Sequence, residues 1–165
     1  MMSKLAIVYF SESNNTKAAA EYVLSKVEAK IIRIQGKGNV NPLKGMLKIA
    51  AHPVGEPWKE IADCERILLM SPVYAWSGVP EILSFLKNAD LAGKELMIVT
   101  SGADTNPKAG MKVAAQYQKL VENAGGIVGS MTYYQGGDFK KFSGADVIAQ
   151  HVDAVLPQVL AWVNK

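Results

Sequence analysis

The sequence is poor in cysteine, histidine and long apolar runs, and each shortage excludes a class of structure. Cys64 is its single cysteine, so no internal disulfide can form, and His52 and His151 lack the spacing of metal ligands. No uninterrupted apolar run approaches the roughly 18 residues of a membrane-spanning helix, and no secretory leader is recognisable. We therefore expect a soluble, cytoplasmic protein without a metal site and without a membrane partner.

Positive charge is present but dispersed. The net charge of +3 is spread along the chain rather than gathered into a basic run, and this distribution gives no indication of nucleic-acid binding. The chain also lacks the Gly-x-x-x-x-Gly-Lys-Ser/Thr motif of nucleoside triphosphate sites. Gly36-Lys37-Gly38 follows the second expected strand and is not a dinucleotide-binding fingerprint.

Apolar runs alternate with helical patterns from one end of the chain to the other. Five strands are expected, at residues 5–10, 30–34, 66–71, 95–100 and 127–133. Helices are expected at 18–28, at about 42–52, from Pro80 onward, at about 109–123, and near the end of the chain with a kink close to Pro157. With 165 residues this pattern predicts one α/β domain, a doubly wound open parallel sheet with helices on both faces. Ligands of such sheets bind beyond the carboxyl ends of the strands.

The loop that follows the first strand has the composition of an anion site. Ser11 to Lys17 supplies a run of polar side chains directly before an expected helix, whose first backbone N–H groups have no partner within the helix. The hydroxyls of Ser11, Ser13 and Thr16, with the N–H groups of Asn14, Asn15 and Thr16, would suit a phosphate monoester. Helix capping is the alternative explanation for these residues.

Further loops resemble parts of a known cofactor site. The run Ser11-Glu12-Ser13-Asn14-Asn15-Thr16 is similar to the phosphate loop Ser/Thr-x-Thr-Gly-Asn-Thr of the flavodoxins, and Pro72-Val73-Tyr74-Ala75-Trp76-Ser77-Gly78 is similar to their Pro-Val-aromatic-aromatic-Gly loop. Thr100-Ser101-Gly102 and Gly136-Gly137 resemble the third flavin loop and the final glycine turn. Over essentially its whole length, the chain thus resembles a short-chain flavodoxin or flavodoxin-like flavoprotein.

The resemblance implies a sheet of strand order 2-1-3-4-5 and flavin mononucleotide (FMN) as a non-covalent cofactor. The implied cofactor-binding residues are Ser11, Ser13, Asn14, Asn15, Thr16, Pro72, Val73, Tyr74, Ala75, Trp76, Ser77, Gly78, Ser101, Gly102 and Ala103. Either Tyr74 or Trp76 would stack on the flavin ring. No side chain is expected to act as an acid or a base.

Three features depart from the family pattern. Asn14 replaces the loop glycine, and asparagine tolerates the left-handed backbone that such a glycine adopts. Residues 103–107 contain no aromatic side chain to cover the second face of the ring, and the chain is slightly basic where many electron carriers are acidic.

Three functions are compatible with these sequence features. The first is an electron-transferring flavoprotein with a redox partner protein. The second is a quinone or flavin reductase that takes hydride from NAD(P)H. The third is a flavin-free domain that uses the same fold for partner binding.

Overall fold

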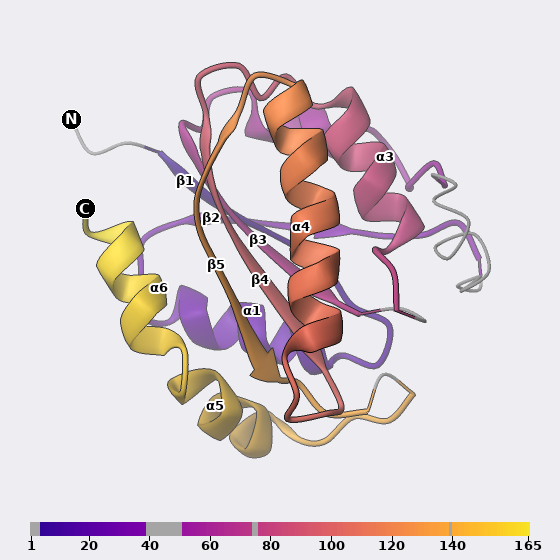
Figure 1. The fold of residues 1–165 in the computed structure, drawn as a ribbon, viewed down its shortest axis with the longest axis vertical. Coiled ribbons are helices and arrows are strands. Elements are labelled where there is room, and N and C mark those ends of the chain that lie inside the picture. Colours follow the sequence, from indigo (N-terminus) through magenta and orange to yellow (C-terminus); the bar gives the residue numbers. More distant parts are fainter. Residues whose placement is uncertain (1–3, 39–50, 74–75, 139) are drawn as a thin grey trace.

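A five-stranded parallel sheet forms the centre of the molecule. The computed structural model describes residues 4–38, 51–73, 76–138 and 140–165. The strands are β1 (Leu5–Phe10), β2 (Lys30–Ile34), β3 (Arg66–Pro72), β4 (Glu95–Gly102) and β5 (Ile127–Gln135), in the order β2-β1-β3-β4-β5 (Figure 1). Every neighbouring pair is parallel. The predicted fold class and strand order are therefore confirmed.

Helices cover both faces of this sheet. On one side lie α3 (Pro80–Asn88), α4 (Lys108–Asn123) and the short 3₁₀ helix η1 (Pro57–Ile61) (Figure 1). On the other lie α1 (Asn15–Leu24), α5 (Ala145–Asp153) and α6 (Leu156–Val163). No helix in the described ranges is long and apolar enough to cross a membrane.

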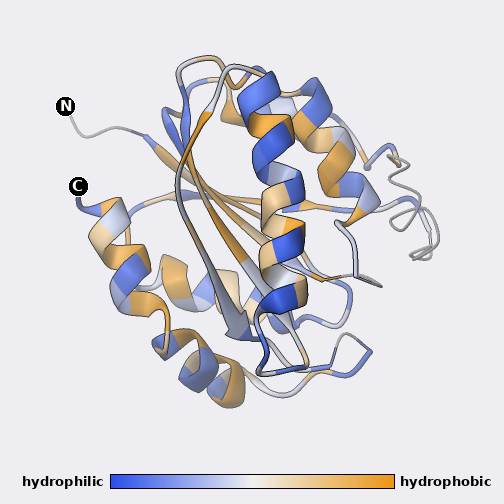
Figure 2. Cartoon of the chain, viewed as in Figure 1, coloured by the Kyte–Doolittle hydropathy of each residue, from blue (hydrophilic) through white to orange (hydrophobic). Residues whose placement is uncertain are grey.

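The two faces of β1 pack into different cores, which explains why its sequence is apolar throughout. Ala6, Val8 and Phe10 belong to the core under α3 and α4, whereas the alternate residues Ile7 and Tyr9 belong to the core under α1, α5 and α6. The edge strand β5 is more exposed and carries fewer strongly hydrophobic residues than the inner strands (Figure 2).

The element boundaries differ from expectation mainly at the carboxyl ends of strands. β3, β4 and β5 each continue past their expected ends, so Pro72, Ser101 and Gly102 lie within strands rather than in loops. Helix α1 begins at Asn15, earlier than expected, and ends at Leu24. The expected break near Pro157 is confirmed, because α5 ends at Asp153 and α6 begins at Leu156. The helix expected at about 42–52 falls almost wholly outside the described residues.

Gly110 allows α4 to approach β4 and β5 closely. A methyl group added at this position would lie 2.7 Å from Cε2 of Tyr133 and 2.8 Å from the hydroxyl of Thr100. Gly110→Ala should therefore lower the free energy of unfolding by about 1 to 2 kcal/mol, because overpacking exceeds the usual gain in helix propensity. Urea denaturation of the variant measures this change.

Ala115→Gly is the matched control, since Ala115 is exposed on the same helix. Ala115→Gly should lower the free energy of unfolding by about 1 kcal/mol, because glycine has a lower helix propensity than alanine. A stabilised Gly110→Ala protein would contradict the close packing of α4.

Candidate functional site

Four strand ends meet around a small cavity at the carboxyl edge of the sheet. Its volume is about 40 Å³, and it is lined by residues that follow or end β1, β3, β4 and β5. The lining residues are Glu12, Ser13, Asn15, Thr16, Pro72, Val73, Ser101, Gly102, Ala103, Gly136, Gly137 and Asp138. Loops whose sequences each predict part of a ligand site thus come together at the edge where doubly wound sheets bind ligands.

The start of α1 leaves backbone N–H groups without intrahelical partners at this cavity. The first helical bond runs from Ala18 N to Asn14 O (3.0 Å), so the amides of Asn15 and Thr16 precede the helical ladder. Asn14 has φ 70° and ψ 3°, and its side chain makes no capping hydrogen bond. The expected left-handed Asn14 is confirmed, and Asn14 does not cap the helix.

Two residues of the same loop carry buried hydroxyl side chains, and of these two only Thr16 lines the cavity. Ser11 Oγ is buried and has no hydrogen-bond partner among the described residues. Thr16 is buried and lines the cavity. A buried hydroxyl without a partner costs about 1 to 3 kcal/mol, so a ligand that accepts a hydrogen bond from it would be favoured. The helix-start amides and the Thr16 hydroxyl can donate hydrogen bonds to a small anion, whereas the charged side chains that line the cavity, Glu12 and Asp138, are both acidic.

Two cationic side chains, Arg33 and Lys17, lie near the loop that follows β1, and neither lines the cavity. Arg33 Nη2 donates to the carbonyl oxygen of Ser11 (3.1 Å), and this bond places a guanidinium beside the loop. Lys17 lies 3.9 Å from Glu21 one turn along α1, as a half-exposed ion pair. This position agrees with the expectation that Lys17 is a helix surface residue rather than a phosphate ligand.

Asn15 joins the loop after β5 to the start of α1. Its Nδ2 donates to the carbonyl oxygens of Asp138 (2.6 Å) and Lys141 (2.9 Å), and its Oδ1 accepts from Ser143 N (2.9 Å). Ser13 Oγ adds a bond to the Asp138 carbonyl oxygen (3.3 Å). The sequence suggested only a backbone role for Asn15, and its side chain is instead committed to the protein.

The end of β4 connects the loops on either side of it. Ser101 O accepts from Val73 N and Gly102 O accepts from Gly136 N, both at 2.8 Å. Gly136 has no room for a side chain, because an added Cβ would lie 2.5 Å from Cβ of Ser101. Ser101 and Gly102 therefore contribute to the cavity from a fixed backbone.

Two tyrosines of β5 lie close to this edge. Tyr133 donates its hydroxyl to the carbonyl oxygen of Asp104 (2.5 Å), and Tyr134 is buried. Burial raises the pKa of both phenols, and the Asp104 carboxylate raises the pKa of Tyr133 further. Both side chains are therefore neutral at physiological pH.

Helix α4 fixes the far end of the loop that follows β3, a role that sequence reasoning missed. The hydroxyl of the fully buried Tyr117 accepts from Val79 N (2.7 Å) and bonds Ser71 Oγ (2.8 Å). Gln116 Oε1 accepts from Gly78 N (3.0 Å). Burial raises the pKa of Tyr117, so its hydroxyl stays protonated. No local motif marks these contacts, because they join residues 38 and 46 positions apart.

The remaining part of this loop lies away from the cavity. Ser77 and Gly78 lie beside Gln116, and Trp76 lines a groove between α3 and α4. Trp76 has φ 66° and is 72% exposed. Tyr74 and Ala75 lie outside the described residues, so the choice between Tyr74 and Trp76 as ring contact stays a prediction.

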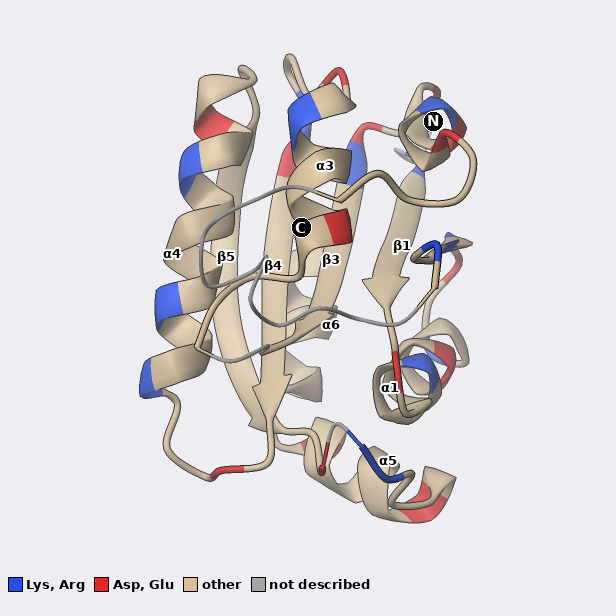
Figure 3. Ribbon diagram, turned by 90° about the vertical axis from the view of Figure 1, so that its right-hand side faces the viewer, with Lys and Arg blue, Asp and Glu red and all other residues tan. Residues whose placement is uncertain are grey.

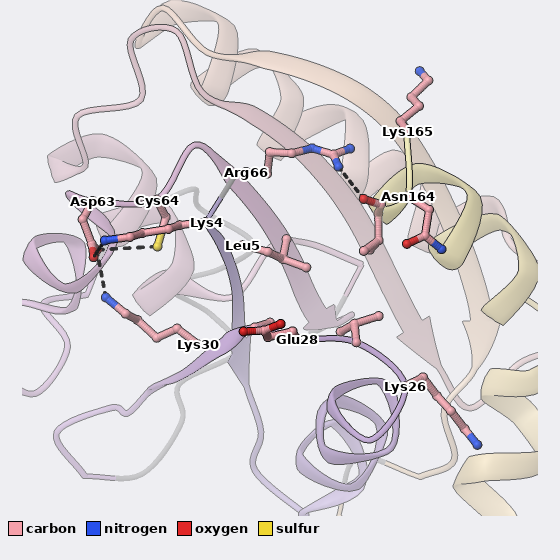
Figure 4. A pocket seen from close by; sticks show the side chains of 13 residues that line it. Lys4, Leu5, Lys26, Glu28, Lys30, Asp63, Cys64, Arg66, Asn164 and Lys165 are labelled. Atoms are coloured by element: carbon pink, nitrogen blue, oxygen red, sulfur yellow. Dashed lines mark hydrogen bonds and ion pairs between the residues drawn. The ribbon is translucent and has the colours of Figure 1, made fainter. Parts of the chain in front are cut away.

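A larger cavity, of about 900 Å³, lies at the opposite edge of the sheet, where Lys4, Lys30 and Arg66 have partners (Figure 4). Lys4 and Lys30 both contact Asp63, at 3.1 and 2.9 Å, and hold the pKa of that carboxyl well below its usual range. Arg66 donates to the carbonyl oxygen of Val163 (2.8 Å). Cys64 is buried there, and burial raises the pKa of its thiol. The described residues contain no cluster of potential metal ligands.

Solved structures share the fold of this chain. No protein-family model and no curated protein sequence matches the chain. A flavodoxin, Flavodoxin 2 from Bacillus cereus, matches over 94% of this chain and 99% of its own, with a TM-score of 0.55 and 18% identity. The chain has the flavodoxin-like fold.

Two further structures of the flavodoxin-like fold match the chain. A flavoprotein from Lactobacillus acidophilus, solved in complex with FMN, matches over 79% of this chain and 93% of its own, with a TM-score of 0.60 and 19% identity. A WrbA-like flavodoxin from Agrobacterium tumefaciens matches over 95% and 96%, with a TM-score of 0.60 and 17% identity. At these identities the likeness shows the flavodoxin-like fold.

Because Asn14 has a positive φ, glycine and alanine at this position should differ in their effect on the free energy of unfolding. Asn14→Gly should leave the free energy of unfolding nearly unchanged, because glycine adopts a positive φ freely. Asn14→Ala should lower it by about 1 to 2 kcal/mol, because alanine pays the left-handed penalty. Urea denaturation of both variants tests the difference, and equal stabilities would contradict a strained Asn14.

The hydroxyl of Tyr117 can be removed without changing the ring. Tyr117→Phe should cost about 1 to 3 kcal/mol, because the buried Val79 N–H loses its acceptor. Hydrogen exchange at the Val79 amide should become faster.

Tyr22→Phe is the control for the loss of Tyr117 Oη, since Tyr22 bonds Asp153 in an exposed setting. It should leave exchange at Val79 unchanged. Unchanged exchange in Tyr117→Phe as well would remove the proposed role of α4 in holding this loop.

Proposed function

We propose that the chain binds FMN non-covalently at the carboxyl edge of its sheet and transfers electrons through it. The observation that carries this proposal is the uncapped start of α1, where backbone amides without intrahelical partners and the buried Thr16 adjoin a cavity built by four strand ends. The FMN complex of the Lactobacillus acidophilus flavoprotein, which has the same fold, supports the choice of ligand.

The phosphate is assigned to the small cavity. A volume of about 40 Å³ has room for a group of a few atoms and not for a three-ring flavin. Ser13 and Thr16 line it, and the amides of Asn14 to Thr16 are the backbone donors. The nearby Arg33 guanidinium offsets part of the negative charge of the bound phosphate.

The flavin ring is assigned to the rim of this cavity, between the loops after β3 and β4. Pro72 and Val73 border the cavity from one loop, and Ser101 to Ala103 border it from the other. Tyr74 or Trp76 supplies the aromatic contact. Ser77 and Gly78 shape the loop through their contacts with Gln116.

Bound FMN would supply the electron-accepting chemistry, and the protein would supply its environment. The backbone groups of Gly102 and Ala103 would place dipoles beside the ring, and the carboxylates of Glu12 and Asp138 also line the cavity. Electron transfer through a bound flavin requires no catalytic acid or base from the protein.

A reductase that uses NAD(P)H is the second candidate function. Ala103 is exposed at the rim, and the described loop 103–107 carries no aromatic side chain, so the outer face of the ring would be open to a nicotinamide or a quinone. Rapid NAD(P)H oxidation with a quinone, in the absence of any partner protein, would select this function over an electron carrier.

Phosphate recognition can be separated from ring recognition. Thr16→Ala should weaken FMN binding roughly tenfold, because one charge-assisted hydrogen bond is lost. Binding of riboflavin, which lacks the phosphate, should change far less. Titration of the apoprotein with each flavin, followed by visible absorbance and flavin fluorescence, measures both affinities.

Thr105→Ala is the matched control for Thr16→Ala, because Thr105 is an exposed threonine outside the cavity. It should bind both flavins as the unmodified chain does. Equal losses of FMN and riboflavin in Thr16→Ala would remove the phosphate role, and an apoprotein that fails to take up FMN would overturn the whole proposal.

A further inference from the structure

A second hollow, separate from the cavity at the strand ends, lies between α3 and α4. Its volume is about 660 Å³, within the range of small-molecule sites. Leu83 of α3 and Ala115 and Leu120 of α4 give it apolar walls. Trp76 borders it from the loop after β3.

Three lysines surround the apolar part of this groove. Lys87 extends from α3, and Lys112 and Lys119 extend from α4, two helical turns apart. All three are exposed, and no described carboxylate forms an ion pair with any of them. Figure 3 shows that basic segments recur along α4 and also mark α3. The groove therefore has a surplus of positive charge.

Trp76 is held in an unfavourable backbone conformation beside these lysines. A positive φ of 66° is an outlier for a bulky side chain, and burial does not compensate for it, because the indole is 72% exposed. Strain of this kind is concentrated at ligand sites. An exposed indole at the mouth of a groove offers a flat surface on which another ring can stack.

We propose that the groove between α3 and α4 binds a nucleotide, with its base against Trp76 and its phosphates between Lys112, Lys119 and Lys87. Lysine ammonium groups bind phosphate as point charges, and the apolar walls suit the ribose and base edges. A concave site suits a small molecule better than a protein, because lysine is depleted at protein interfaces. The inference goes beyond the proposed function, since it does not require FMN.

Gln116 connects the two sites. It lines the groove, and its Oε1 accepts the hydrogen bond from Gly78 N in the loop assigned to the flavin. A nucleotide in the groove would contact the same side chain. Occupancy of the groove is thus expected to alter the environment of the 72–78 loop.

Titration of the apoprotein with ADP, in low salt and without divalent metal, tests the proposal. Adenosine and inorganic pyrophosphate are titrated in parallel, because each carries only one of the two recognised groups. ADP should bind measurably, and each fragment should bind at least roughly fivefold more weakly. Calorimetry gives the affinities, and quenching of indole fluorescence reports contact with Trp76.

Paired substitutions locate the ADP site. Lys112→Ala combined with Lys119→Ala should weaken ADP binding roughly tenfold, and Trp76→Gly roughly fivefold with loss of the fluorescence change. Glycine is chosen because it accepts the φ of Trp76 without strain. Lys26→Ala combined with Lys165→Ala is the matched control, since both lysines adjoin the cavity at the opposite edge (Figure 4). It changes the net charge equally and should leave ADP binding unaltered.

Three results would overturn the proposal. The first is that the unmodified chain does not bind ADP. The second is that both double-lysine variants weaken ADP binding equally. The third is that pyrophosphate binds as tightly as ADP and that Trp76→Gly binds ADP as the unmodified chain does. FMN titration of the same proteins keeps the two proposals apart. If the unmodified chain binds ADP but not FMN, the proposed function is rejected and the nucleotide site stands, whereas binding of FMN without ADP does the reverse.

Discussion

Burial of β1 on both faces is the constraint on which the arrangement of the site depends. Alternate residues of this strand pack into two separate cores, so both faces of the strand are covered up to its end at Phe10. The chain leaves the sheet at Ser11 and enters α1 at Asn15, with Asn14 in a left-handed conformation between them. The free amides of the helix start are therefore placed at the edge where β3, β4 and β5 also end.

Side chains from both helical layers hold the loops around that edge. Asn15 of α1 bonds the loop after β5 from one face, and Gln116 and Tyr117 of α4 bond the loop after β3 from the other. Backbone bonds from the end of β4 connect the two loops. Ligand groups would thus meet a surface whose donors are already oriented, which lowers the cost of ordering on binding.

Local patterns were sufficient for some features of the fold and site. The apolar run of β1 predicted a central strand, because only a strand covered on both sides is apolar throughout. Pro157 predicted the break between α5 and α6, since proline cannot donate the helical hydrogen bond. The predicted parallel sheet placed the loops after its first, third, fourth and fifth strands at one edge, and residues from all four line one cavity.

Other features depend on contacts that no local pattern encodes. Ser101 and Gly102 resemble loop residues in sequence, yet they extend β4 because β3 and β5 supply ladder partners beside them. The Asn15 side chain bonds residues more than 120 positions away, and Tyr117 resembles an ordinary core aromatic until its hydroxyl partners are seen. Such long-range hydrogen bonds are properties of the folded chain rather than of a sequence window.

The burial of Cys64 has a consequence for handling the protein in the presence of oxidants. The thiol is 1% exposed and its pKa is raised, so little reactive thiolate is presented to solvent near neutral pH. Disulfide cross-links between copies are correspondingly disfavoured. Electrons exchanged in a redox titration of the protein would therefore not be expected to come from this thiol.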